Sequence, residues 1–495
     1  MSPASRLPNR RVIYLAAIPI AVALVATAVF VVVSRGCGGL FSSRSTTDTG
    51  ECVGLIEESD ALAPELRKAA EQILRENERV AESPGRYVKV ALLTPLSLAE
   101  NSASAMSIDQ VRYSLQGAMT ALHRINRGQD FGDPSAMRVQ LLLVNYGSRQ
   151  EHREEIINEI VAETKSDEHP LVAVVGLGSS FSGTEATARE LSERGIPMVT
   201  GVASADSLTA RTAPTLYSVS PSNTDYALAL RELLRGSLGL RSGIIVADQN
   251  EDPYVRTLRD AFEQILEPYV KFPLLRFQGG TVASPATPNV FNPVVTNICT
   301  AVNNRKTPLD MVFFAGRVAD FRAFAGALEQ RICRDDPLAV LVGATGFQEA
   351  QQYADVLERG NITVIYASST DPPAWINGRN SPPDGFGPFH ERYQQLGFDN
   401  ASLADGYAIM YHDALVSAAL AIRVATLGSP IPKPADVQGQ VANLTGAYVV
   451  RAASGTLSFA EREDGRAAGK VVTYRQVGRN RAIHLPPDLP PYLTR

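Results

Sequence analysis

The chain has 495 residues, of which 45% are hydrophobic and 20% are charged, as in ordinary globular proteins. This length exceeds what one compact core can organise, so it predicts two or three domains. The net charge of −5 provides no basic field and argues against a nucleic-acid partner.

The N-terminal segment predicts a membrane anchor. Arg6, Arg10 and Arg11 precede an uncharged apolar run over residues 12–33. A run of roughly 20 apolar residues spans a bilayer as a helix, and the flanking arginines stay on the cytoplasmic side. Residues 1–11 would then be a short cytoplasmic tail, and the bulk of the chain would be extracytoplasmic, on the outer side of the cell membrane.

Two other readings of this segment stay open. A signal peptide could be cleaved after Ala26-Thr27-Ala28, which has an A-x-A pattern, and a lipoprotein could be modified at Cys37. Both also export the rest of the chain. In every case the compartment favours disulfides.

The four cysteines are therefore expected to form disulfides. Proximity in the sequence pairs Cys37 with Cys52 and Cys299 with Cys333. Each closed loop would contribute about 3 kcal/mol in the chain-entropy model. No C-x-x-C pair and no histidine pair at ligand spacing accompanies them, so neither a zinc site nor another metal site is expected.

Residues 34–86 are expected to form a linker that contains a lead-in helix over 61–82. An alternation of aliphatic strands and helices then begins. Near-continuous apolar strands between helices are typical of a parallel sheet that is covered on both faces. The first unit has strands at 88–94, 137–146, 171–176 and 196–201, and helices at 108–125, 149–164 and 182–194.

A second unit of the same kind follows, so the sequence predicts two α/β lobes that face a cleft. Its strands are at 242–248, 270–277, 309–316, 338–344 and 362–368, and its helices are at 224–237, 254–266, 288–303 and 318–331. The C-terminal part should have a loop at 371–388, helices at 388–396 and 402–427, a hairpin at 446–464, a strand at 470–477 and a flexible tail at 479–495.

Four passages give the chain a resemblance to a known family. They are VKVALLTPLS (88–97), AVVGLGSSFSGTEATARELSERGIPMVTGVASADSLT (173–209), IIVADQNEDPYVRTLRDAF (244–262) and GAYVVRAASGTLSFAEREDGRAAGKVVTYRQV (446–477). In order and spacing they resemble the type I periplasmic binding proteins, in particular the leucine/isoleucine/valine-binding branch of ABC-importer solute receptors. The resemblance covers residues 87 to 478.

The resemblance implies a lobe assignment and a binding mode. Lobe one would hold 87–218 and 372–444, and lobe two would hold 219–371 and 445–478. A small-molecule ligand would bind between the lobes at the carboxyl ends of the strands, as open α/β sheets favour, and the lobes would close by hinge motion. No cofactor is expected.

The loop GLGSSFSG (176–183) is similar to the family's hydroxyl-rich loop that meets a ligand carboxylate, which implies Ser179 and Ser180 as ligand contacts. The start of a helix favours anions. A phosphate loop would need a lysine where Thr184 and Glu185 stand. A purely structural turn stays open.

The resemblance also implies Ala203 and Ser204 in the second loop and Tyr254 from lobe two as ligand contacts. A helix cap at Ser204 and simple packing of Tyr254 stay open. Thr345 occupies the position where amino-acid binders have an acidic residue for the ligand's ammonium. This departure puts a standard α-amino acid in doubt, because a buried ammonium needs a countercharge. Arg317 and Val318 stand where family members offer a tyrosine; Arg317 could face an anion, but a position in water is favoured.

The sequence therefore favours a membrane-anchored, extracytoplasmic solute-binding protein that captures a small polar molecule for an ABC permease. A sensory ectodomain that signals through a membrane partner is the alternative. An extracytoplasmic enzyme is disfavoured, because no G-x-S-x-G, H-E-x-x-H or P-loop motif is present. The six histidines stand singly and are expected at the surface or at caps.

Overall fold

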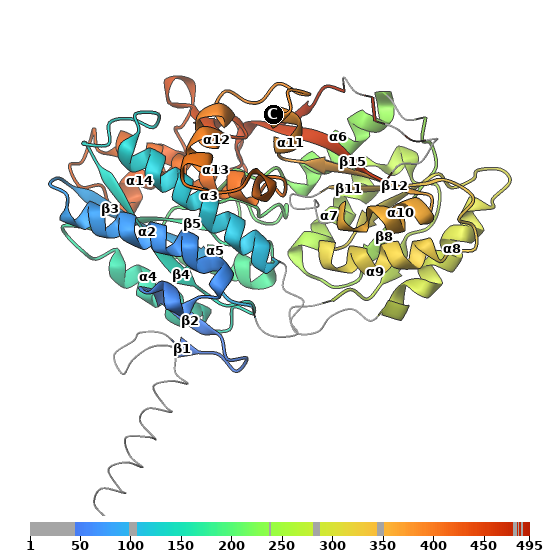
Figure 1. Cartoon of the computed structure of the whole chain (residues 1–495), viewed down its shortest axis with the longest axis horizontal. Helices are drawn as coiled ribbons and strands as arrows, with labels where there is room; N and C mark the ends of the chain where they lie inside the picture. The colour runs from blue at the N-terminus through green and yellow to red at the C-terminus, as the bar shows by residue number, and fades with distance from the viewer. Residues whose placement is uncertain are drawn as a thin grey trace, which may run out of the picture.

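Two β-sheets, each covered by helices on both faces, form two lobes that lie side by side (Figure 1). The computed structural model describes residues 45–98, 106–236, 239–280, 288–343, 351–478, 483, 485–486 and 489–495. The expected cytoplasmic tail and membrane helix, Cys37 with its pairing to Cys52, and Thr345 lie outside the described residues.

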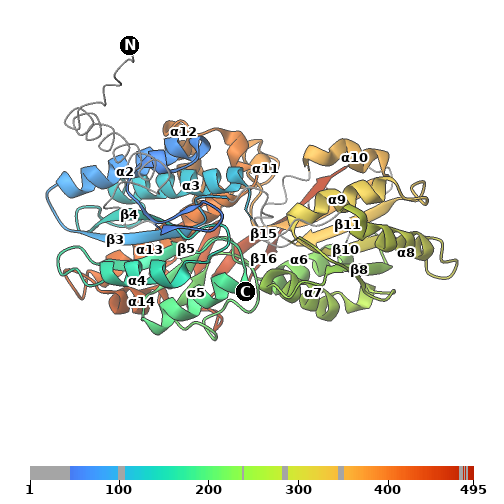
Figure 2. The same ribbon diagram turned by 90° about the horizontal axis from the view of Figure 1, so that it is seen from below.

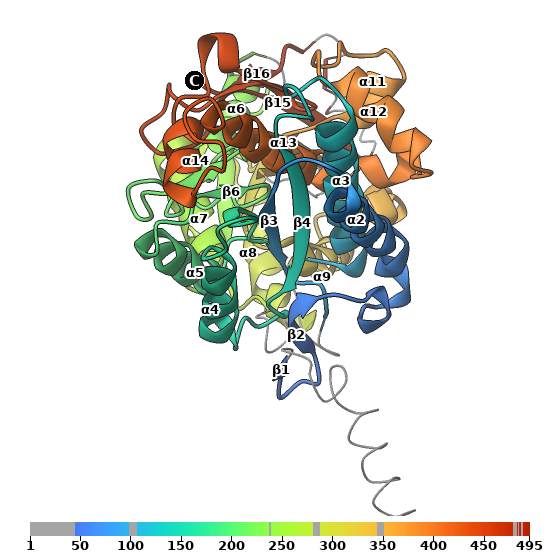
Figure 3. The same cartoon turned by 90° about the vertical axis from the view of Figure 1, so that its left-hand side faces the viewer.

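The sheet of lobe one has the strand order β1-β2-β4-β3-β5-β6-β7. Helices α2 and α3 cover one face and α4 and α5 cover the other (Figure 3). The strands are β1 (Ser45–Thr46), β2 (Cys52–Ile56), β3 (Tyr87–Thr94), β4 (Arg138–Asn145), β5 (Leu171–Gly176), β6 (Met198–Thr200) and β7 (Leu216–Ser218). The helices are α2 (Pro64–Glu82), α3 (Ile108–Arg127), α4 (Arg153–Glu163), α5 (Ser182–Glu193), α11 (Pro372–Ile376), α12 (Phe386–Gln395), α13 (Tyr407–Ala425) and α14 (Pro434–Val441).

The sheet of lobe two has the order β13-β14-β15-β12-β11-β10-β8-β9. The strands are β8 (Gly243–Asp248), β9 (Leu275–Phe277), β10 (Met311–Ala315), β11 (Leu338–Gly343), β12 (Ile362–Ser368), β13 (Val450–Ala452), β14 (Gly455–Ser458), β15 (Ala468–Val477) and β16 (Tyr492–Leu493). The helices are α6 (Asn223–Gly236), α7 (Pro253–Ile265), α8 (Asn292–Val302), α9 (Val318–Glu329) and α10 (Ala354–Arg359). Short 3₁₀ turns are η1 (Ser59–Ala61), η2 (Glu267–Tyr269), η3 (Pro288–Phe291), η5 (Asn400–Leu403) and η6 (Gly446–Tyr448).

The parallel arrangement follows from the aliphatic strands, because alternate side chains of one strand fill both cores. In β3, Val90 and Leu92 pack into the core under α2 and α3, whereas Ala91 and Leu93 pack into the core under α4 and α5. The two-lobe α/β architecture is thus confirmed. The expected disulfide is also confirmed, since Cys299 and Cys333 are bonded with their Cα atoms 5.4 Å apart.

The segment expected to be a linker with a lead-in helix is instead part of lobe one from Ser45 onward. Strand β2 pairs antiparallel with β4, with Leu55 opposite Val144. Helix α2 buries Leu66 and Ile73 in the same core as α3. The reason is the apolar stripe of α2, which is long enough to pack along a neighbouring helix despite the charged opposite face.

Strand β15 crosses from lobe one to lobe two (Figure 2). Its first residue Ala468 follows Ala467, which lies in the core of lobe one, whereas Val472 and Val477 lie in the core of lobe two. The hairpin of β13 and β14 adds to the sheet of lobe two, but its Val450 and Leu457 pack into the core of lobe one. The hairpin therefore belongs to both lobes.

The expected flexible tail ends in a strand instead. Strand β16 pairs antiparallel with β15, with Val471 opposite Leu493, and the backbone of Thr494 exchanges bonds with Gly469 and Lys470. Pro490 and Pro491 do not prevent this pairing, because only the two residues that follow them, Tyr492 and Leu493, belong to β16. Strand β9 is shorter than the expected 270–277, since Pro273 has no N–H to donate to a ladder.

Within the described part of the chain, α13 has a length and apolar character that would suit a bilayer crossing, but 89% of that stretch is buried inside the protein. It is the central helix of lobe one. His412 on this helix is fully buried, contrary to the expectation of a surface position. Its Nε2 accepts from Arg124 at 2.8 Å and its Nδ1 donates to Asp413 at 2.8 Å, so two buried partners replace water. Burial lowers the pKa of His412 to about 4.

Candidate functional site

A cavity of about 280 Å³ lies between the two lobes, at the carboxyl ends of the parallel strands. Lobe one and lobe two both contribute to its wall, as a ligand cleft of an α/β fold requires. The residues of lobe one are Ser148, Arg149, Gln150, Phe181, Ser182 and Gly183, and those of lobe two are Asn250, Asp252, Gly280 and Arg317.

A tight turn after β5 brings α5 to this cavity. Gly176, Leu177 and Gly178 all have positive φ, at 99°, 60° and 67°. A Cβ atom on Gly178 would lie 2.9 Å from the hydroxyl of Tyr146, so glycine is needed for this close approach. Phe181 then takes the N-cap position of α5 and provides no side-chain cap. The uncapped start of the helix adds a partial positive charge beside the cavity.

Ser179 and Ser180 lie in this loop, next to the cavity. The hydroxyl of Ser180 is 3% exposed and accepts from the backbone N–H of Ala205 at 3.1 Å. The carbonyl of Ser179 accepts from the hydroxyl of Thr184 at 2.7 Å. Both residues thus shape the loop and tie it to its neighbour in lobe one, and their expected contact with a ligand stays a prediction.

Ala203 and Ser204 form the neighbouring loop after β6, but their carbonyl groups already have partners. The carbonyl of Ala203 accepts from Nη1 of Arg466 at 3.1 Å, and that of Ser204 accepts from the N–H of Asn223 at 2.8 Å. Both residues are at most 5% exposed. The expected acceptor for a ligand amine at Ala203 is therefore engaged within the protein.

Arg466 is a residue that the sequence patterns missed. Its side chain is 1% exposed, and it also donates to the carbonyls of Ala205 at 2.7 Å and Ser220 at 3.0 Å. Burial lowers its pKa, whereas the nearby Asp206 raises it. Arg466 fastens the loop after β6 to the segment where the chain leaves lobe one. No local signal in the sequence marks this role, because its partners are distant in the chain.

Arg317 does not sit in water, contrary to the expectation from the sequence. Its side chain is only 11% exposed. Its Nε donates to Oδ2 of Asp252 at 2.8 Å, and its Nη2 reaches lobe one and donates to the carbonyl of Ser180 at 2.8 Å. The centre of the guanidinium lies 4.1 Å from the ring centre of Phe181 and 5.2 Å from that of Tyr254. Arg317 thus bridges the two lobes, because β10 ends at the face that lobe one covers.

Tyr254 begins α7 and is 8% exposed. Its hydroxyl donates to the carbonyl of Gly343, at the end of β11, at 3.4 Å. Burial raises the pKa of Tyr254 above its ordinary value. The residue packs against Arg317 and is not among the residues that line the cavity, so its expected contact with a ligand stays a prediction.

The charges around the cavity are unequal. Arg149 and Arg317 provide two positive charges, while Asp252 is the only carboxylate among the lining residues. Asp252 also caps α7, because its Oδ1 accepts from the N–H of Val255 at 3.1 Å. Arg149 also pairs with Glu151 at 3.7 Å, outside the lining. Among the lining side chains alone one positive charge is in excess, and together with the start of α5 it suits the cavity to an anionic or polar group.

A pair of carboxylates lies just behind the cavity wall. Asp248 is fully buried, and Asp320 is 3% exposed and accepts from the N–H of Gly280 at 2.9 Å. Burial and the charge of Asp248 raise the pKa of Asp320 to about 6. Gly279 has no room for a side chain, since a Cβ there would lie 2.2 Å from Asp248 Oδ2. Across the described ranges, no group of three or more His, Cys, Asp or Glu side chains could hold a metal ion.

The solved structures that this chain resembles include solute-binding proteins of ABC transporters. The leucine-binding protein of Thermotoga maritima is 15% identical, with a TM-score of 0.54, over 79% of this chain and 96% of its own. The ABC-transporter solute-binding protein of Rhodopseudomonas palustris in complex with 4-hydroxybenzoate is 16% identical, with a TM-score of 0.55, over 82% and 97%. An ABC-transporter substrate-binding protein of Aeropyrum pernix is 13% identical, with a TM-score of 0.58, over 79% and 92%.

No protein-family model and no curated protein sequence matches the chain. At 13–16% identity the structural likeness defines the fold and nothing finer. The chain therefore has the type I periplasmic binding fold, the fold of the leucine- and branched-chain amino-acid-binding proteins of ABC transporters.

Proposed function

We propose that this protein is an extracytoplasmic solute-binding protein, held to the cell membrane by residues 12–33, which delivers a small carboxylate-bearing molecule to an ABC-type importer. The observation that carries the proposal is the cavity of about 280 Å³ with walls from both lobes. A volume near 300 Å³ is at the lower end of small-molecule sites and suits a compact metabolite. The named activities of the structural neighbours, which are substrate-binding proteins of ABC transporters, support this reading.

The charge of the cavity supports a carboxylate as the recognised group. Arg149 lies on the wall of lobe one, and its Nε is shielded from solvent and has no hydrogen-bond partner among the described residues. A carboxylate would give this N–H an acceptor. The aromatic ring of Phe181 borders the same space and offers an apolar surface for the rest of the ligand. Two neighbours with this fold bind hydroxybenzoate, which has these two features.

Calorimetry with a panel of small carboxylates tests the proposal on the full chain. The panel includes 4-hydroxybenzoate, aliphatic acids and the matching amides. We expect a carboxylate to bind with one site per chain and the matching amide to bind more weakly. Arg149→Gln should weaken the carboxylate by roughly 1.5–3 kcal/mol, the worth of a hydrogen bond to a charged group. Equal binding of acid and amide, or an unchanged affinity in the variant, would show that the cavity does not select an anion through Arg149.

Leucine, isoleucine and valine should bind weakly, with dissociation constants above about 100 μM, because an ammonium without a countercharge costs several kcal/mol to bury. This expectation rests on Thr345, where amino-acid binders have an acidic residue. Asp252 is a carboxylate on the cavity wall, but it is already paired with Arg317. Micromolar binding of leucine would show that Asp252 or another group supplies the countercharge.

The membrane anchor is tested separately. N-terminal sequencing of the mature protein from the membrane fraction should show an uncleaved segment before residue 12. A mature chain that starts at Val29, or a lipid on Cys37, would contradict the anchor and would leave the binding function untouched.

A further inference from the structure

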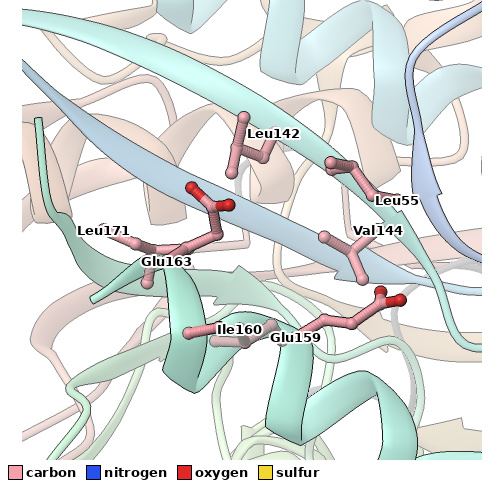
Figure 4. Close-up of a pocket in the computed structure, with 8 residues that line it drawn as sticks. Leu55, Leu142, Val144, Glu159, Ile160, Glu163 and Leu171 are labelled. Carbon is pink, nitrogen blue, oxygen red and sulfur yellow. The ribbon is translucent and has the colours of Figure 1, made fainter. Parts of the chain in front are cut away.

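A hollow on lobe one lies away from the cavity between the lobes. It has a volume of about 180 Å³ and opens between α4 and the sheet formed by β2, β4 and β5 (Figure 4). A cavity of about 150 Å³ with aliphatic walls is large enough to hold benzene. The hollow therefore has room for one six-membered ring. It is lined by Leu55, Leu142, Val144, Glu159, Ile160, Ala162, Glu163 and Leu171.

The hollow exists because β2 extends the sheet by one antiparallel strand beyond β4. Helix α4 lies nearest β2, where the carboxylate of Glu159 accepts from the backbone N–H of Leu55, and it leaves part of the sheet beside it open. As a result, Leu55 and Leu142 stay only partly buried, although both point to the face that α4 covers. An apolar surface that is left in contact with water in this way favours an apolar occupant.

The two glutamates at the rim differ in their partners. Figure 4 shows them at opposite ends of the apolar floor, both on α4. Glu163 forms an ion pair with Lys89 at 2.7 Å. Glu159 has no cation in its surroundings that affects its pKa: its carboxylate accepts from the backbone N–H of Leu55, and its Oε2 is shielded and has no partner among the described residues. Glu155, one turn earlier, adds a like charge.

We propose that this hollow binds a small organic cation, which carries a primary ammonium or guanidinium group on an aromatic ring or on a chain of about six carbons. The apolar part covers Leu142, Val144 and Ile160, and the cationic group donates to Glu159. A rotation about the last bond of the Glu159 side chain turns Oε2 toward the hollow, and such terminal torsions are soft. Burial raises the pKa of the Glu159 carboxyl, because the charged form is poorly solvated there. A bound cation stabilises that charged form.

Charge complementarity separates this ligand class from others. A neutral molecule of the same shape would leave the shielded oxygen of Glu159 without a donor. A carboxylate would be repelled by Glu155 and Glu159 together. The inference does not depend on the function proposed for the cavity between the lobes, since no residue lines both sites.

The test is calorimetry on the full chain with three probes of one shape: benzylammonium, benzyl alcohol and benzoate. We expect benzylammonium to bind with one site per chain and to bind at least about tenfold more tightly than benzyl alcohol, as a hydrogen bond to a charged group implies. Glu159→Gln should weaken benzylammonium by about the same factor. Glu154→Gln is the matched control: this exposed carboxylate lies on the same helix, does not line the hollow and does not affect the pKa of Glu159.

A second variant guards against misfolding of the first. Leu55→Trp fills the hollow and leaves Glu159 in place, and thermal unfolding checks that each variant is folded. Loss of benzylammonium binding in both folded variants, with binding kept in Glu154→Gln, supports the site. Equal binding of benzyl alcohol, unchanged binding in either folded variant, or no heat at about 10 mM benzylammonium overturns it.

Discussion

The bridge made by Arg317 predicts that its removal opens the lobes. In Arg317→Ala, the side chain loses the 2.8 Å hydrogen bond to the carbonyl of Ser180 and its stacking on Phe181, both of which connect lobe two to lobe one. The bond to Asp252 is also lost, but it lies within lobe two. Only the first two contacts change the balance between closed and open lobes.

The size of the effect follows from these two contacts. A hydrogen bond to a charged donor contributes roughly 1.5–3 kcal/mol, and a partly buried cation–π contact contributes roughly 0.5–2 kcal/mol. Together they favour the closed arrangement by roughly 2–5 kcal/mol, because the guanidinium is 11% exposed and little screened by water. The ratio of closed to open lobes should therefore fall by about thirtyfold or more.

Distance measurement between spin labels reads this ratio directly. One label is placed at Asp167→Cys in lobe one and the other at Lys306→Cys in lobe two, both at exposed positions. The protein is purified without added ligand. Arg317→Ala should shift the distance distribution toward longer values. Arg256→Ala is the control, since its Nη2 is 4.0 Å from Glu185 of lobe one and 36% of its side chain is exposed, so the pair contributes little.

The bridging role of Arg317 is refuted if Arg317→Ala and Arg256→Ala both keep the parent distribution. That result would mean that the hinge segments, and not the contacts across the cavity, hold the lobes in place. A shift of the same size in both variants would also refute this role, because the buried Arg317 should contribute most of the free energy that favours closed lobes.

Three further predictions concern stability, measured by urea unfolding of the full chain. Arg466→Ala should lower the free energy of unfolding by roughly 3–5 kcal/mol, since several buried carbonyls lose their donor; a loss below about 1 kcal/mol would contradict this. Removal of the Cys299–Cys333 disulfide, whose partners are 34 residues apart, should cost about 3–4 kcal/mol in the chain-entropy model, and an unchanged midpoint would count against it. Asp320 has a pKa raised to about 6 by burial, so the native state favours its neutral form and its contribution to stability is lost as the pH rises from about 4 to about 6. Asp320→Asn should therefore be more stable than the parent above pH 6, by roughly 1–3 kcal/mol, and the difference should vanish near pH 4.

The sequence predicted the two parallel sheets because aliphatic runs such as LVAVVG in β5 and LAVLVG in β11 are buried on both faces. It missed β2, whose five residues contain Gly54 and pair antiparallel at an edge. Short edge strands of this kind have no continuous apolar run and are recognised only once their neighbour is known. The same applies to β16, which pairs through two residues.

The sequence indicated the glycine-rich loop beside the cavity. It placed Arg317 in water and gave no sign of the role of Arg466. The turn of Gly176 and Gly178 can be read from the sequence, because glycine tolerates positive φ. Arg466 bonds to carbonyls that are about 250 residues earlier in the chain, and Arg317 bonds to one that is 137 residues earlier. Backbone carbonyls are present at every residue, so no pattern of side chains indicates which of them an arginine will reach.

The strand that crosses between the lobes has a mechanical consequence. Strand β15 pairs with β14 at Ala468 and Lys470, with β16 at Val471 and Val472 and with β12 over Thr473 to Val477, so ladders stiffen it along its whole length. This crossing can therefore bend only where the chain passes from Arg466, which bridges with Ser218 of lobe one, to the ladder that begins at Ala468. The lobes would then open by hinge rotation about an axis at this crossing, with little sliding of one lobe along the other.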